Sequence, residues 1–171
     1  MKPSIEQQFL QAYEEYADAI YRHCVVRVTD SEKGMELMQE TFLRALESVQ
    51  QGTKVENMRA FLYKIANNLI IDTYRQKRHD SSLDEMAEAY GFDPADERTD
   101  VNVARVHQGM EAIEHLHLLE EPYRTVLIMR YVDGLPVKDI ADVLGVTVNV
   151  ASVRIHRGLK QLTSLLGPTH A

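Results

Sequence analysis

The stretch "IADVLGVTVNVASVRIHRGLKQL", residues 140–162, has the pattern of a helix, a tight turn and a second helix. Gly145 suits a turn that needs a positive φ, and Thr147 can cap the second helix. The pattern is typical of a helix-turn-helix, whose second helix enters the major groove of DNA. An ordinary packed helical hairpin would have the same periodicity, so this segment alone leaves both interpretations open.

The second helix of this stretch is amphipathic. Small and apolar residues such as Ala151, Ile155 and Gly158 fall on one side of a helical wheel. Ile140, Ala141 and Leu144 of the preceding helix supply the facing surface. The opposite side carries the residues we expect to face DNA, which are Asn149, Ser152, Val153, His156, Arg157 and Lys160.

The chain of 171 residues has a formal net charge of -7, which would disfavour binding to DNA if the charge were evenly spread. The charge is unevenly distributed along the sequence. Residues 54–79 hold six bases against two acids, and residues 150–171 hold three bases and no acid. Between them, residues 80–100 hold eight acids against Arg98. Two basic modules therefore flank an acidic connector, and the net charge conceals both.

Composition and the amino terminus restrict the class of protein. The chain is 44% hydrophobic and 26% charged, which predicts a folded protein with one ordinary domain or two small ones. Its first residues contain no apolar run of signal-peptide or membrane length, so we expect a cytoplasmic protein without membrane insertion. The single cysteine, Cys24, excludes an internal disulfide, and we expect a small buried residue rather than a metal ligand shared with His23.

Apolar spacings of three and four recur while strand signals are weak, which predicts an all-α fold. One helix carries Phe9, Tyr13 and Cys24 on a stripe, and a second follows Asp30 and Ser31, which suit an N-cap. A third long helix is expected over about residues 58–78.

The acidic connector separates two expected helical domains. Residues 80–100 contain Gly91 and Pro94 among the acids, which favours a linker over a regular element. We therefore expect a first domain over residues 1–79 and a second over residues 101–171. The linker could be a solvated tether, or it could fold back over the basic faces and weaken DNA binding.

Three segments together carry a more specific signal. They are "ELMQETFLRAL" (36–46), "NMRAFLYKIANNLIIDTYRQKR" (57–78) and "EEPYRTVLIMRYVDGLPVKDIADVLGVTVNVASVRIHRGLKQL" (120–162). In this order they closely resemble regions 2 and 4 of bacterial RNA polymerase sigma factors of the sigma-70 family, extracytoplasmic-function (ECF) group. The resemblance covers roughly residues 5–166. It implies a region 2 helical bundle and a region 4 helix-turn-helix.

The resemblance implies a role for each segment. The helix over residues 36–47 would dock on the clamp coiled coil of the polymerase β′ subunit, with Gln39, Glu40 and Arg44 as contacts and Leu37 as an apolar anchor if it is exposed. The helix over residues 58–78 and the preceding loop would handle the −10 element as the duplex opens. The residues expected to contact this element are Lys64, Asn67, Asn68, Arg75 and Arg78.

Those residues suit opened DNA because basic side chains attract phosphate, and side-chain amides can hydrogen-bond the edges of nucleobases. A merely solvated charged face is the alternative.

Region 4 would read the −35 duplex, and here the sequence departs from the family pattern. Relatives commonly have Gly-Thr-Val-Lys-Ser-Arg where this chain has "NVASVR", residues 149–154. The front of the helix therefore offers fewer charged contacts, and the −35 sequence cannot be borrowed from relatives.

Two other classes of protein compete with this interpretation. A stand-alone helix-turn-helix regulator would bind a duplex operator without polymerase, but it would leave the first module unexplained. An enzyme is disfavoured because the chain has no phosphate-binding Gly-rich loop, no His-Glu-x-x-His pair and no nucleophile with a recognisable base. We expect a non-catalytic protein without cofactor or metal. The resemblance implies three partners, which are core RNA polymerase, promoter DNA and an anti-sigma factor.

Overall fold

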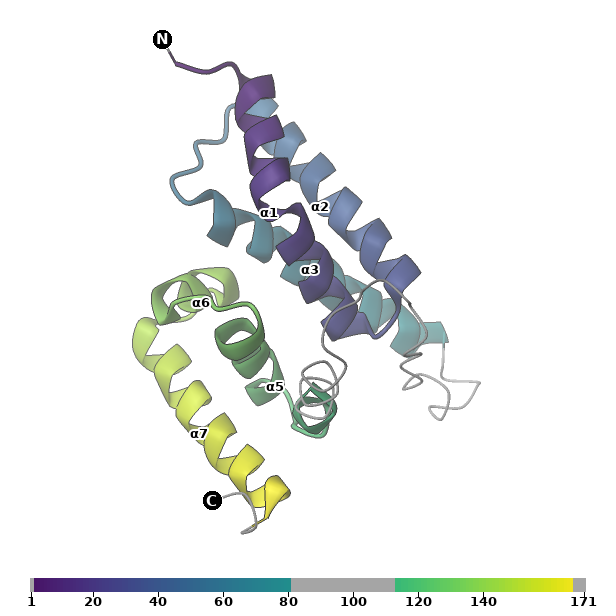
Figure 1. Ribbon diagram of the computed structural model, residues 1–171, viewed down its shortest axis with the longest axis vertical. Coiled ribbons are helices and arrows are strands. Elements are labelled where there is room, and N and C mark those ends of the chain that lie inside the picture. Colours follow the sequence, from purple (N-terminus) through teal and green to yellow (C-terminus); the bar gives the residue numbers. More distant parts are fainter. Residues whose placement is uncertain (1, 81–112, 168–171) are drawn as a thin grey trace, which may run out of the picture. The chain divides into compact units, whose positions relative to one another are not determined.

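The computed structural model describes residues 2–80 and 113–167, and all regular structure in these ranges is helical (Figure 1). The chain divides into two compact units, Met1–Asp93 and Pro94–Ala171. The expected linker over residues 80–100 and the start of the second domain at 101 lie, apart from residue 80, outside the described residues.

Three long helices form the first unit, namely α1 (Ile5–Val28), α2 (Ser31–Gln50) and α3 (Met58–Asp80). Each of the three packs against the other two. Figure 1 shows α1 and α2 running side by side in opposite directions, because only two residues connect them. The third helix runs almost as expected from the sequence.

Polar side chains cap the helices of the first unit. The Ser4 hydroxyl accepts a hydrogen bond from the Gln7 amide at 3.2 Å, and the Gln7 side chain accepts one from the Ser4 amide at 3.0 Å, which completes a capping box. The Asp30 carboxylate accepts from the Lys33 amide at 3.1 Å, so of the two predicted N-cap residues Asp30 is the cap and Ser31 is the first residue of α2. These bonds fix where α1 and α2 begin.

The core of the first unit lies between the three helices. Ile20, Cys24 and Ala66 are fully buried there, which confirms Cys24 as a small core residue. The ring of His23 meets Tyr63 edge-on, with 5.1 Å between ring centroids. Gly34 lets α1 and α2 approach closely, because a Cβ at this position would lie 2.5 Å from the Val25 Cγ2.

The second unit consists of shorter helices. Residues 113–117 are helical, and α5 (Tyr123–Leu127) continues directly into a π-helical turn, η1 (Ile128–Val132). The Asp133 amide donates to the Ile128 carbonyl at 3.0 Å, which is the wider spacing of a π-turn. Gly134 follows with φ 71°, a left-handed conformation that favours glycine and does not continue a helix.

The remaining helices, α6 (Val137–Leu144) and α7 (Val148–Leu166), form the predicted helix-turn-helix. Gly145 has φ 67° in the turn, and the Thr147 hydroxyl accepts from the Val150 amide at 3.2 Å. Gly158 packs α7 against α5, since an added Cβ would lie 3.1 Å from the Leu127 Cγ. The turn and the close packing fix the direction in which the outer face of α7 points within this unit.

Candidate nucleic-acid and polymerase interfaces

The outer face of α7 presents all six residues that the sequence assigned to the −35 element. Asn149, Ser152, Val153, His156, Arg157 and Lys160 are all exposed. The inner face is a narrow stripe of Ala151, Ile155 and Gly158, which are buried against the other helices of the unit. A narrow stripe leaves the rest of the helix circumference open to a partner.

The outer face of α3 presents four of the five residues assigned to the −10 element. Lys64, Asn68 and Arg75 are exposed and recur at helical spacings along one line of the helix, with Arg78 one turn further on. The exposed carboxylate of Asp72 lies on the same line. This surface therefore combines an amide with cations that can attract phosphate.

Asn67 does not belong to this surface, and its expected exposure was wrong. Its side chain is buried, and its amide oxygen accepts a hydrogen bond of 2.9 Å from the Arg27 guanidinium of α1. Arg27 is itself 4% exposed, and its backbone carbonyl accepts a hydrogen bond from the Tyr74 hydroxyl. A buried guanidinium needs acceptors, so Asn67 helps to hold α1 and α3 together.

The outer face of α2 presents Gln39, Glu40 and Arg44, as the sequence predicted. The Arg44 Nε donates to the Glu40 carboxylate at 2.9 Å, and both side chains remain about half exposed. Leu37 is only 5% exposed, so the condition for an apolar anchor fails at this position. It lies at the edge of the helix face that packs in the bundle and adds to the core.

Leu43 is the apolar residue that sequence reasoning missed on this face. Its side chain is 51% exposed. It follows Gln39 by four residues and precedes Glu47 by four, so it lies among the polar residues of the outer face. The signal was present in the spacing of the sequence, because Leu43 falls outside the stripe of buried positions that includes Met38, Phe42 and Ala45.

The phenol of Tyr16 on α1 has a pKa above its ordinary value. Burial raises the pKa of its phenol, and the neighbouring Glu15 carboxylate acts in the same direction. Arg59, near the start of α3, acts in the opposite direction. The phenol therefore stays protonated at neutral pH and is a neutral donor near the beginning of α3.

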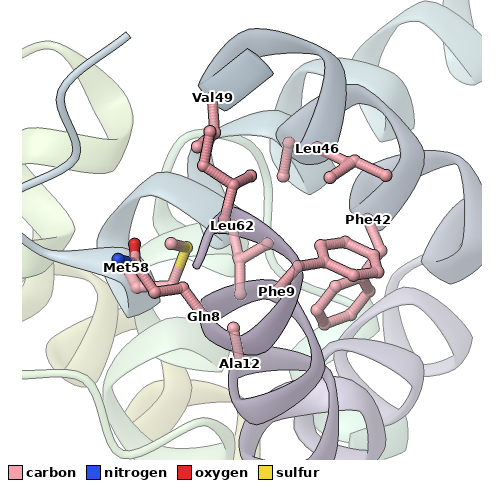
Figure 2. Close-up of a pocket in the computed structure, with 10 residues that line it drawn as sticks. Gln8, Phe9, Ala12, Phe42, Leu46, Val49, Met58 and Leu62 are labelled. Atoms are coloured by element: carbon pink, nitrogen blue, oxygen red, sulfur yellow. The ribbon is translucent and has the colours of Figure 1, made fainter. Parts of the chain in front are cut away.

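An apolar pocket lies between the first turns of α1, the last turns of α2 and the start of α3 (Figure 2). The rings of Phe9 and Phe42 meet at its wall, with centroids 6.1 Å apart in an edge-to-face arrangement. Met58 and Leu62 of α3 contribute to its lining, and Gln8 is the polar residue of that lining. The apolar lining makes it part of the packing of the bundle.

Both units match known sequence families. Residues 12–79 match the family described as Sigma-70 region 2, which takes in most of α1, all of α2 and nearly all of α3. Residues 110–162 match the family described as Sigma-70, region 4, which takes in the helix-turn-helix. The two regions occur in one chain in the order that the sequence predicted.

The chain belongs to the sigma-70 family of RNA polymerase sigma factors, in its ECF group. The ECF RNA polymerase sigma factor SigW of Bacillus subtilis is 29% identical to it, over 97% of this chain and 92% of the relative. The ECF RNA polymerase sigma factor SigE of Mycolicibacterium smegmatis is 28% identical, over 89% of this chain and 59% of that protein. The resemblance stated from the sequence is confirmed.

Solved structures share the fold. The sigma factor RpoE of Bartonella quintana, solved in complex with the anti-sigma factor NepR, aligns with a TM-score of 0.74 at 20% identity. The alignment covers 95% of this chain and 99% of that one. CnrH, solved in complex with the cytosolic domain of CnrY, aligns with a TM-score of 0.69 at 21% identity over 94% and 88% of the two chains. The predicted all-α fold with sigma regions 2 and 4 is confirmed.

As an ECF sigma factor, the protein binds RNA polymerase and acts in transcription initiation. Sigma factors are not catalytic, which agrees with the sequence-based expectation that the chain is not an enzyme. Among the helices of residues 2–80 and 113–167, none is long and apolar enough to cross a membrane.

Proposed function

We propose that this sigma factor binds core RNA polymerase through α2, contacts the opened −10 element through α3 and reads the −35 duplex through α7. The observation that carries the proposal is the presence of regions 2 and 4 in one chain, each with an exposed polar helix face. A stand-alone regulator would need only the helix-turn-helix, and it would leave the surfaces of α2 and α3 without a purpose.

The outer face of α2 is proposed to dock on the clamp coiled coil of the β′ subunit. Leu43 takes the anchoring role that the sequence assigned to Leu37, because an exposed leucine among polar residues can be buried by a partner. Gln39, Glu40 and Arg44 surround it with hydrogen-bonding and charged groups. An exposed ion pair such as Glu40–Arg44 contributes little to stability, so both charges remain available for binding.

The outer face of α3 is proposed to contact the opened −10 element. Lys64, Arg75 and Arg78 would hold the phosphates of the separated strands. The sequence assigned the base-contacting role to both asparagines, and Asn68 keeps it because its amide is exposed on the same line of the helix as Lys64 and Arg75.

The outer face of α7 is proposed to enter the major groove of the −35 duplex. Its amino-terminal turns carry Asn149, Ser152 and Val153, which is the part of a recognition helix that contacts base edges. His156 and Arg157 lie one turn further along and can reach bases or phosphates, and Lys160 can hold phosphate. The acidic stretch over residues 80–100 would then be the linker between a region 2 domain over 1–79 and a region 4 domain over 101–171.

An anti-sigma factor is proposed as a further partner, which would mask the polymerase-binding surfaces until a signal arrives. Two of the solved structures that share the fold, one in complex with an anti-sigma factor and one with the cytosolic domain of CnrY, support this proposal. Because polymerase acts in the cytoplasm, we place the protein there as well.

A charge exchange on α2 tests polymerase docking. Glu40→Arg together with Arg44→Glu keeps an ion pair at the same spacing but inverts the charges that a partner meets. We expect at least tenfold weaker binding to core polymerase with unchanged helical content. The matched control exchanges Asp18 and Arg22, an exposed acid and base four residues apart on α1, and should bind normally. Equal binding by the two exchange variants would show that α2 does not dock.

A further inference from the structure

The first turns of α7 expose an unusual number of apolar side chains. Val148 is 51% exposed, and Val150 and Val153 are each 37% exposed. The helix carries no charged residue before Arg154. Single exposed apolar residues are common on protein surfaces, but these three lie within six residues of a helix whose remaining outer face is polar and basic.

The three valines are not equivalent in position. Val153 lies opposite the buried stripe of Ala151, Ile155 and Gly158, four residues from both Asn149 and Arg157. It therefore occupies the centre of the candidate groove-facing surface. Val150 lies three residues before it, on the same side of the helix. Val148 is the first residue of α7 and falls toward the packed side of the helix.

The conformation of these side chains is well constrained. The Val150 amide donates to the Thr147 hydroxyl at 3.2 Å, which anchors the first turn of the helix. A valine in a helix has one strongly preferred χ1 rotamer, so little rotational freedom is lost when its methyl groups are covered. Val150 and Val153 thus present a rigid apolar surface in the part of the helix that meets base edges.

Valine can recognise only one feature of the major groove. It has no donor or acceptor for the nitrogen and oxygen atoms of base edges, whereas thymine carries a 5-methyl group that no other base presents. A cytosine amino group opposite valine would lose its water without gaining a hydrogen bond. The chemistry of the face therefore points to a methyl group as its complement.

We propose that Val153, with Val150 beside it, selects promoters by contact with thymine 5-methyl groups in the −35 duplex. The inference rests on the proposed role of α7 in reading that element. His156, Arg157 and Lys160 flank the valines and supply the attraction to phosphate that apolar side chains lack. In this module the valines add apolar selection to the polar base contacts proposed for Asn149 and Ser152, and the basic residues position the helix.

Replacing thymine by deoxyuridine tests the inference, because it removes the methyl group and leaves every donor and acceptor of the base pair unchanged. The protein is the full chain in complex with core polymerase, and the probes are promoter duplexes with single substitutions in the −35 element. At one or two positions we expect wild type to bind deoxyuridine about threefold to fivefold more weakly than thymine, the ratio for one buried methyl group.

Variants assign the effect to a residue. Val153→Ala should bind the thymine duplex more weakly and should no longer distinguish deoxyuridine at the affected position, since the contact is already lost. Val148→Ala, which truncates a more exposed valine away from the centre of the face, should keep the wild-type ratio. Loss of discrimination in Val148→Ala but not in Val153→Ala would overturn the assignment.

A scrambled −35 element separates failure of this inference from failure of the proposed function. If scrambling weakens binding but every deoxyuridine duplex binds like its thymine parent, the methyl contact is overturned and the −35 role stands. If scrambling has no effect, α7 does not read a −35 element and both proposals fall.

Discussion

The outer faces of α3 and α7 differ in how closely exposure follows polarity. On α7 every polar or basic residue assigned to the outer face is exposed, whereas on α3 Asn67 is buried beside its exposed neighbour Asn68. The two asparagines are identical in chemistry and adjacent in sequence. Their different surroundings show that packing, and not residue type, decides which polar group is available to a partner.

The width of the buried surface explains the difference. The buried part of α7 is a stripe of small and apolar residues, which leaves its polar half open. Most of one side of α3 is buried between α1 and α2, from Ala60 to Thr73. Asn67 falls inside this wide buried surface and meets Arg27, which a helical wheel for α3 alone cannot reveal.

Substituting the two asparagines separately should give the largest difference in stability between exposed and buried positions. Asn67→Ala removes an acceptor from the buried Arg27 guanidinium and should lower the free energy of unfolding of region 2 by about 2–3 kcal/mol. Asn68→Ala should change stability by less than about 0.5 kcal/mol, because the side chain is exposed. Hydrogen exchange of peptides from α1 and α3 measures both values.

In promoter opening, the order of the two variants should be reversed, with the larger direct effect in Asn68→Ala. Permanganate reactivity of the −10 strands should fall for Asn68→Ala at polymerase concentrations that saturate binding. Normal opening in Asn68→Ala would remove the proposed contact with unpaired bases. Faster exchange in Asn68→Ala than in Asn67→Ala would contradict the account of which side chain is buried.

Replacing one glycine in each unit by alanine shows how tightly the helices of that unit pack at that position. Gly34→Ala should cost about 2 kcal/mol, because the added Cβ would meet both the Val25 side chain and its backbone, at 2.5 Å and 3.2 Å. Gly158→Ala meets the Leu127 side chain at 3.1 Å, which can shift, and gains helix propensity. Its net effect should stay within about 1 kcal/mol. Hydrogen exchange of α2 and α7 measures both losses of stability. A larger loss in Gly158→Ala than in Gly34→Ala would contradict the expected order.

Loss of one cap in each unit is expected to have the smallest effect. Thr147→Ala and Asp30→Ala each remove one side-chain bond to a first-turn amide, worth about 1 kcal/mol. Both should shift the melting temperature slightly, but only Thr147→Ala should also weaken binding to the −35 duplex, because it loosens the first turn of α7. Equal promoter affinity in the two variants would mean that a fixed first turn is unnecessary for −35 recognition.

Local sequence signals predicted much of the fold. Asp30 caps α2, Gly145 adopts φ 67° in the turn and Thr147 caps α7, each as expected, because turns and caps depend on a few neighbouring residues. The exposed set on α7 followed from periodicity for the same reason. The close approach at Gly34 and the π-turn η1 were not predicted, since both depend on how helices meet.

The candidate sites were predictable to the extent that they depend on one helix. Leu37 and Leu43 are both leucines of α2, yet packing in the bundle buries the first and leaves the second exposed. The buried Arg27 at the end of α1 has no local signal at all, because its acceptor is forty residues away in sequence. Contacts between distant segments therefore account for the errors in the predicted sites.

Run-off transcription with core RNA polymerase on a genomic promoter library tests whether both exposed faces act together in promoter selection. We expect the chain to direct discrete start sites, each preceded by two elements at a fixed spacing. Changes in the upstream element should interact with substitutions in α7, and changes in the downstream element with Asn68→Ala. Transcription no higher than that of core polymerase alone, together with tight binding of the free chain to a duplex operator, would show that the two faces do not select promoters together.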